Sequence, residues 1–171
     1  MSDDRPDEPG PERAAALRRA LIRNFDDVPL ERQHRPPLYD TRYGGVSQGT
    51  AASKLGAGVD VLPPGMRSCP YHFHHAQEEL FIVIEGEGSL RVAGELLPIR
   101  AGDMIFIPAG PEYPHQIVNT SDAPLKYLSI STQERPEVCE YPDSGKIGAF
   151  ARGLRHVQMR DAGIDYWEGE P

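Results

Sequence analysis

Short apolar or alternating segments, each bounded by turn-forming residues, dominate the chain from Tyr43 onward. Ten of them have the length and the β-branched or aromatic content of strands: 51–55, 58–62, 71–75, 79–84, 89–92, 95–99, 104–107, 115–119, 126–132 and 138–141. Tight-turn residues such as Ala93-Gly94 separate them. Regular short strands joined by such turns are typical of an antiparallel sandwich or barrel. We therefore expect an all-β domain over residues 43–142, preceded by an N-terminal extension.

The two ends of the chain have a different pattern. Residues 1–12 carry five acidic residues and three prolines, with one large apolar side chain, so they predict a disordered tail. Residues 143–171 contain two weaker strand patterns, at 146–150 and 156–159. We expect this C-terminal extension to pack on the barrel or on a partner subunit.

A short helix and a connection complete the extension over residues 1–42. Apolar residues at Ala14, Leu17 and Leu21 predict an amphipathic helix beginning at Pro11, packed on the domain with its arginines in solvent. Residues 26–37 contain three prolines and predict an irregular connection.

Composition narrows the classes of function. The net charge of -8 over 171 residues disfavours binding to nucleic acid, which needs a basic surface. We find no signal-like start and no apolar run of about 20 residues, so we expect a cytoplasmic protein without a membrane span. The two cysteines, Cys69 and Cys139, are too few for a disulfide scaffold and predict reduced thiols.

Candidate chemistry is concentrated between residues 70 and 86. His72 and His74 are two positions apart, so on an extended strand both imidazoles lie on one face. Two carboxylates, Glu78 and Glu79, follow after a short interval, and His115 begins a later strand. Imidazole and carboxylate together form a mixed nitrogen and oxygen donor set that suits divalent metal ions.

These residues fall in two motifs that resemble those of the cupins. The first motif is carried by Gly65, His72, His74, Glu79 and Gly86. The second is carried by Gly102, Pro108, Gly110, His115 and Asn119. The first contains one extra residue before His72, and the second contains two extra residues between Gly110 and His115. In particular, the chain resembles single-domain cupins described as sugar-phosphate isomerase-like.

The resemblance implies a double-stranded β-helix, or jelly-roll barrel, with His72, His74, Glu79 and His115 as metal ligands. One divalent ion, such as Zn, Fe, Mn or Ni, is expected. The donor set suits all four ions and does not identify which one is bound. A six-coordinate ion would keep two positions for water, substrate or dioxygen, whereas tetrahedral zinc would be nearly saturated.

Strand alternation and the cupin spacing disagree about the carboxylate. On an unbroken strand Glu78 would share the face of the histidines, whereas the cupin spacing selects Glu79. We expect Glu79, which requires a turn or bulge at residues 75–77 and places Phe81 and Val83 inside. The opposite face of the same strand is also apolar, so we expect a homodimer that covers it.

Three hypotheses about function remain open. The first is a metalloenzyme with isomerase- or dioxygenase-type chemistry on a sugar, a sugar phosphate or an organic acid. The second is a non-catalytic module that binds a small molecule, such as a sugar, through the metal. The third is a storage or structural barrel with a saturated site. Near the motifs, we interpret His75 as a surface residue, Asn119 as a turn cap and Cys69 as a packed thiol.

Overall fold

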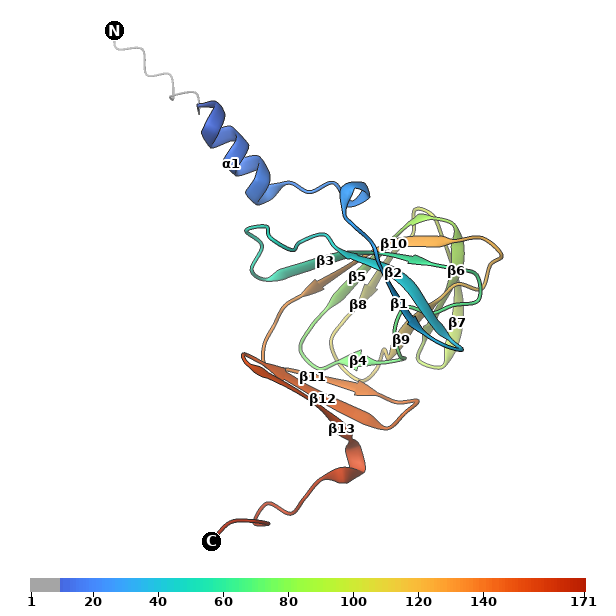
Figure 1. The fold of residues 1–171 in the computed structure, drawn as a ribbon. Helices are drawn as coiled ribbons and strands as arrows, with labels where there is room; N and C mark the ends of the chain where they lie inside the picture. The colour runs from blue at the N-terminus through green and yellow to red at the C-terminus, as the bar shows by residue number, and fades with distance from the viewer. Residues whose placement is uncertain (1–9) are drawn as a thin grey trace.

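The computed structural model describes residues 10–171 and consists mainly of antiparallel strands. The predicted disordered tail lies almost entirely outside the described residues; its last two residues, Pro11 and Glu12, begin helix α1 (Pro11–Leu21). Figure 1 shows a barrel-like body, a smaller sheet of C-terminal strands beneath it, and α1 and the C-terminus extending away from the body. The all-β prediction is confirmed.

Three sheets make up this architecture. The largest has the order β1 (Glu31–Arg35), β2 (Tyr39–Gly45), β3 (Leu55–Leu62), β10 (Leu125–Thr132), β5 (Glu79–Glu85) and β8 (Met104–Ile107). The second has the order β13 (Leu154–Met159), β12 (Lys146–Ala151), β11 (Glu137–Tyr141) and β4 (Phe73–His74). The third has the order β7 (Glu95–Arg100), β6 (Glu87–Val92) and β9 (His115–Val118). Every pairing between these strands is antiparallel.

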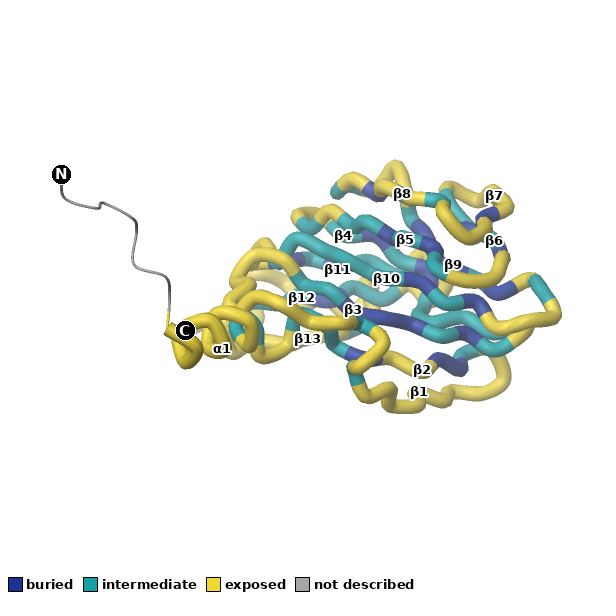
Figure 2. Tube along the Cα trace, turned by 90° about the horizontal axis from the view of Figure 1, so that it is seen from above, coloured by how far each residue is buried: buried dark blue, intermediate teal, exposed yellow. Residues whose placement is uncertain are grey.

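The core lies inside the barrel, between the first and third sheets. Its buried members come from seven strands: Leu62, Phe81, Val83, Leu90, Ile99, Ile107, Ile117, Leu125 and Tyr127. Phe81 and Val83 are buried while Leu80, Ile82 and Ile84 are only partly buried, which is the alternation expected when Glu79 faces inward. Figure 2 shows the buried segments concentrated in the barrel strands.

Two parts of the N-terminal half differ from the sequence-based expectation. Residues 26–37 do not form an irregular connection throughout, because β1 occupies five of them and pairs with β2. All five residues of β1 are exposed and polar, so no apolar alternation marked the strand; Arg32 instead forms an ion pair with Asp40 of β2. Residues 51–54 form no strand, and β3 begins only at Leu55.

Helix α1 forms where expected but does not pack on the domain. None of its residues is buried, and Leu17 and Leu21 are exposed. Its C-terminal end is attached to the following loop, where the backbone N–H of Ala51 donates to the carbonyl of Ala20 at 2.8 Å. Among residues 10–171, no helix has the length and apolar character needed to cross a membrane.

Candidate metal centre

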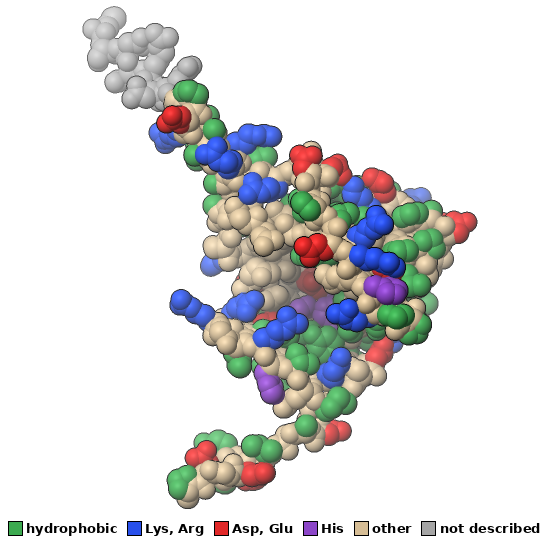
Figure 3. All heavy atoms as spheres, viewed as in Figure 1, with side chains coloured by type: hydrophobic (Ala, Val, Ile, Leu, Met, Phe, Trp, Pro, Cys, Tyr) green, Lys and Arg blue, Asp and Glu red, His purple; other side chains and the backbone are tan. Residues whose placement is uncertain are grey.

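The four predicted ligand residues come together where the three sheets meet. His74 lies in β4 of the second sheet, Glu79 begins β5 of the first, and His115 begins β9 of the third. His72 precedes β4 and forms an isolated bridge to His115, with backbone N–H to carbonyl distances of 3.1 and 2.7 Å in the two directions. Figure 3 shows a hollow in this face of the molecule, with histidine side chains visible inside.

A single carboxylate oxygen is the centre of the cluster. Oε2 of Glu79 lies 2.7 Å from Nε2 of His115, 3.5 Å from Nε2 of His74 and 3.9 Å from Nε2 of His72. Donors bound at right angles to one ion at about 2.1 Å would lie about 3 Å apart, so these spacings suit a shared ion after small adjustments. His115 is 1% exposed, which fixes it firmly in the barrel wall.

Backbone carbonyls fix two of the imidazoles. Nδ1 of His72 lies 2.9 Å from the carbonyl oxygen of Pro70, and Nδ1 of His115 lies 3.1 Å from that of Tyr113. A carbonyl can only accept, so each Nδ1 donates, and each Nε2 is directed at the centre of the cluster. Nε2 of His115 lies 2.7 Å from Oε2 of Glu79, which is close enough for the two atoms to share a proton or a metal ion. The donor atoms therefore fit a metal.

The electrostatics of the site also suit a cation. Burial acts to raise the pKa of Glu79, but the hydrogen bond with His115 and the electrostatic attraction of the surrounding histidines outweigh it and lower that pKa. Burial lowers the pKa of His74, against the attraction of Glu79. At neutral pH the carboxylate is therefore ionised and the imidazole of His74 is neutral, which are the states that metal ligation requires.

A buried carboxylate outside the motifs holds the turn that brings Glu79 inward. Glu137, which is 2% exposed, accepts hydrogen bonds from the backbone N–H groups of His75, Ala76 and Gln77 at 2.9, 3.0 and 3.0 Å. This turn breaks the alternation between His74 and Glu79. Glu78, the competing candidate, is exposed, and its N–H donates to Thr132.

Sequence reasoning missed Glu137. Its Oε1 also lies 3.3 Å from Nδ1 of His74, so it adds negative charge beside a candidate ligand. The sequence offers little signal, because Glu137 precedes the expected strand 138–141; in the structure it begins β11 and shares a buried face with Cys139. An acidic residue on the buried face of a strand needs donors, and here they come from a turn about 60 positions earlier in the chain.

Three other residues near the motifs lie outside the group of candidate ligands. His75 points away from the cluster and lies 2.9 Å from Glu140. Asn119 is buried; its amide donates to the carbonyls of Leu62 and Ala123, and its side-chain oxygen accepts from Ser121, as expected of a turn cap. Tyr113 is exposed and contributes its carbonyl to His115.

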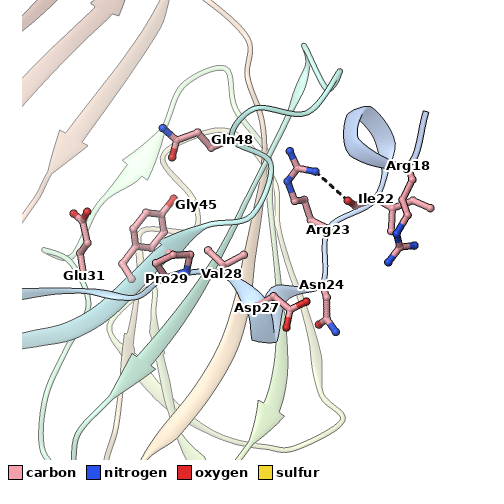
Figure 4. A pocket seen from close by; sticks show the side chains of 12 residues that line it. Arg18, Ile22, Arg23, Asn24, Asp27, Val28, Pro29, Glu31, Gly45 and Gln48 are labelled. Atoms are coloured by element: carbon pink, nitrogen blue, oxygen red, sulfur yellow. Dashed lines mark hydrogen bonds between the residues drawn. The ribbon is translucent and has the colours of Figure 1, made fainter. Parts of the chain in front are cut away.

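Two hollows with polar residues in their linings border the cluster. One, of about 350 Å³, is bordered by Glu79 and by polar residues that include Tyr43, Ser129 and Gln133. The other, of about 280 Å³, is bordered by His72, His74, Gln133, Arg135, Glu137, Cys139 and Tyr141, among others. Gln133 borders both hollows. A larger cavity of about 690 Å³ lies near the C-terminal end of α1 and is lined by residues such as Arg23 and Asp27, away from the histidines (Figure 4).

Comparisons with known proteins indicate the family of the chain. Residues 58–131 match the cupin domain family. An uncharacterised protein from Methanocaldococcus jannaschii is 33% identical over 97 residues, covering 57% of this chain and 70% of that protein. An oxalate-binding protein from Thermotoga maritima is 36% identical over 69 residues, covering 40% of this chain and 54% of that protein.

Solved structures show the same fold. A cupin-superfamily sugar phosphate isomerase from Silicibacter pomeroyi superposes with a TM-score of 0.73 at 23% identity, covering 86% of this chain and 98% of the other. A Klebsiella pneumoniae protein with a double-stranded β-helix domain superposes with a TM-score of 0.53 at 18% identity, covering 67% of this chain and 91% of the other. The predicted jelly-roll fold is thereby confirmed. By the match of residues 58–131 to the cupin domain family, together with the relative from Methanocaldococcus jannaschii, the chain belongs to the cupin superfamily.

Proposed function

We propose that this protein is a metal-dependent enzyme that acts on a small polar molecule: a sugar, a sugar phosphate or an organic acid. The observation that carries the proposal is the convergence of three imidazole Nε2 atoms on one oxygen of Glu79, at 2.7 to 3.9 Å, beside hollows that open to solvent.

One divalent ion, Fe, Mn, Ni or Zn, would be held by His72, His74, Glu79 and His115. Three neutral imidazoles and one carboxylate suit each of these ions. When bound, the ion supplies Lewis acidity toward an oxygen of the substrate. The chain itself keeps the two Nε2 lone pairs of His72 and His115 aimed at the centre through the carbonyls of Pro70 and Tyr113.

The lining of the hollows supports a polar, anionic substrate. Ser129, Gln133 and Tyr43 offer hydroxyl and amide groups on one side. On the other side Arg135 offers a guanidinium, which matches the geometry of a carboxylate or phosphate. Among the proposed substrate classes, the similarity to an oxalate-binding protein supports an organic acid.

The alternative is a module that binds the same class of molecule without turnover. The observation in its favour is that, besides the candidate metal ligands and Glu137, the groups bordering the hollows that could act as a general base are two tyrosines and two thiols, and burial raises the pKa of each of them: Tyr43, Tyr141, Cys69 and Cys139. The carboxylate of Glu79 already contacts His115, and that of Glu137 accepts hydrogen bonds from the backbone of the turn at residues 75–77.

We further propose a cytoplasmic homodimer. Both cysteines are free thiols, as in a reducing compartment. Outside the barrel, Leu55 and Phe106 are exposed and border an apolar hollow of about 450 Å³ together with Leu80 and Ile130. Contiguous apolar surface of this kind marks an interaction site, and a second copy of the chain is the partner we propose.

Metal analysis of protein purified without an affinity tag tests the central proposal. We expect about one equivalent of a divalent ion per chain in the wild type and in His75→Ala, and far less in His74→Ala. His75→Ala is the matched control because its imidazole is adjacent in sequence but pairs with Glu140 outside the site. Equal metal content in His74→Ala and the wild type would contradict the site.

Incubation of the metal-loaded protein with sugar phosphates and organic acids, with and without oxygen, separates the two functions. Product formation by the wild type that is lost in His74→Ala supports the enzyme. Saturable binding of an acid or sugar phosphate by calorimetry, without product, supports the binding module instead.

A further inference from the structure

A second donor cluster overlaps the first and includes a thiol. Ligand atoms of His72, His74 and Cys139 all lie within 4.8 Å of one another. The first cluster, His72, Glu79 and His115, meets the same limit. His72 belongs to both clusters and His74 is also one of the four candidate ligands, so the sulfur-containing donor set shares two imidazoles with the candidate metal centre.

The strand register places the thiol. In the pairing of β11 with β4, Cys139 lies directly opposite His74. Side chains of directly opposed residues lie on the same face of a sheet, with Cβ atoms about 5 Å apart. Cys139 is buried, yet it borders the 280 Å³ hollow together with both histidines. An ion entering from that hollow therefore meets sulfur as well as nitrogen.

His74 is free to serve either cluster. The rings of His72 and His115 are fixed by hydrogen bonds to backbone carbonyls. Nδ1 of His74 is buried and has no hydrogen-bond partner within the described chain, although an oxygen of Glu137 lies 3.3 Å away. Nε2 of the same ring is 3.5 Å from Glu79. This imidazole is thus the one candidate ligand whose orientation is not set by a hydrogen bond.

We propose that Cys139 is an additional metal ligand, which thiophilic divalent ions such as Co²⁺, Zn²⁺ and Cd²⁺ recruit together with His72 and His74. Thiolate sulfur favours these ions over Mn²⁺, which prefers oxygen donors such as Glu79. On binding, the S–H bond breaks, its proton passes to the buffer, and the sulfur lone pair forms the bond to the ion. The inference rests on the proposed function because the two sites share His72 and His74.

Cobalt spectroscopy tests the inference without relying on activity. The metal-free protein is loaded with Co²⁺, and the near-ultraviolet sulfur-to-cobalt charge-transfer band is recorded. Wild type and Cys69→Ser should show the band, while Cys139→Ser and Cys139→Ala should lack it. Cys69→Ser is the matched control, because its Sγ is 3.9 Å from Nδ1 of His72 but it does not belong to either donor cluster.

Metal competition gives a second readout. In Cys139→Ser, affinity for Cd²⁺ should fall at least about tenfold while affinity for Mn²⁺ is unchanged. The ¹¹³Cd NMR shift of the wild type reports sulfur ligation without any substitution, so the test does not depend on the variants folding.

The outcomes separate this inference from the proposed function. Bound cobalt with no charge-transfer band, or a ¹¹³Cd shift typical of nitrogen and oxygen donors alone, would overturn the role of Cys139 and leave the metal site intact. A band that persists in both Cys139 variants would also overturn it. Absence of bound metal in the wild type would overturn both proposals.

Discussion

Asp60 allows a quantitative test of how a buried carboxylate affects the stability of this barrel. It lies in β3, is 6% exposed, and accepts hydrogen bonds from the hydroxyls of Thr41 at 3.0 Å and Ser129 at 3.4 Å. Burial raises the pKa of Asp60 from 3.8 to about 6, because the two hydroxyl hydrogen bonds only partly offset the loss of water around the carboxylate.

The shift predicts a loss of stability as pH rises. The folded protein holds the Asp60 proton up to about pH 6, whereas the unfolded chain releases it near pH 4. The contribution of the protonated carboxyl group to the unfolding free energy is therefore complete below about pH 4 and is lost between about pH 4 and 6. A shift of about 2 units corresponds to about 3 kcal/mol. Asp60→Asn keeps the shape and an acceptor for Thr41 but carries no charge. We expect the variant to exceed the wild type by about 2–3 kcal/mol in unfolding free energy above pH 7, and to match it near pH 4.

Urea unfolding of the metal-free protein across this pH range measures the difference directly. Asp143→Asn serves as the control with the opposite sign, since the hydrogen bond from Arg91 lowers the pKa of Asp143 and its carboxylate therefore stabilises the fold above pH 4. A difference between Asp60→Asn and the wild type that stays constant from pH 4 to pH 7, or a variant less stable than the wild type at neutral pH, would refute the reasoning.

Four further predictions concern the turns, the surface and the metal. Glu137→Gln should lower metal affinity about 10- to 100-fold in calorimetry, because an amide cannot accept all three backbone N–H groups of the turn; unchanged affinity would exclude a positioning role. Gly86→Ala should reduce unfolding free energy by about 1–3 kcal/mol, because Gly86 has a φ of 83° and a Cβ there would clash with the Pro124 carbonyl; Gly94→Ala, at a φ of 86° with open space, should lose less. Phe106→Glu, at a side chain 69% exposed, should convert the expected dimer to a monomer in light scattering without a change in circular dichroism, and a monomeric wild type would contradict the interface. A divalent ion at a hundred times its dissociation constant should raise unfolding free energy by about 2.7 kcal/mol in wild type and much less in His74→Ala, as measured by urea unfolding.

Hydrophobic alternation and turn-forming residues predicted many of the barrel strands and turns, because neighbouring residues along the chain determine these elements. The alternation of Phe81 and Val83 with Leu80 and Ile82 matches their burial in β5. Ala93 and Gly94 both have positive φ in the tight turn between β6 and β7, as turn-forming residues should. By contrast, β1 is polar throughout and is held by backbone pairing with β2, which no hydrophobic pattern records.

The choice between Glu78 and Glu79 needed information that the local sequence does not contain. Strand alternation alone favoured Glu78, and the break in alternation at residues 75–77 is held by Glu137, which follows it by about 60 positions. By accepting from Ala76 and Gln77, the carboxylate replaces the strand pairing that these two N–H groups would otherwise need, while the N–H of His75 also donates to the carbonyl of Val138 at 2.9 Å. The turn is thus a tertiary feature, although it looks local in the sequence.

The lengthened corner before His115 shows why a departure from the cupin spacing still places this side chain at the cluster. The corner contains Tyr113, whose carbonyl binds Nδ1 of His115, and Pro114, whose carbonyl accepts the N–H of Ala93 at 3.0 Å. It is therefore tied to the turn between β6 and β7, and the bridge from His72 to His115 fixes the strand that follows. Because His74, Glu79 and His115 belong to three different sheets, an ion held by them would join all three. The spacing within each motif can then vary by a residue or two, provided that hydrogen bonds at the ends of the strands restore the positions of the donor atoms.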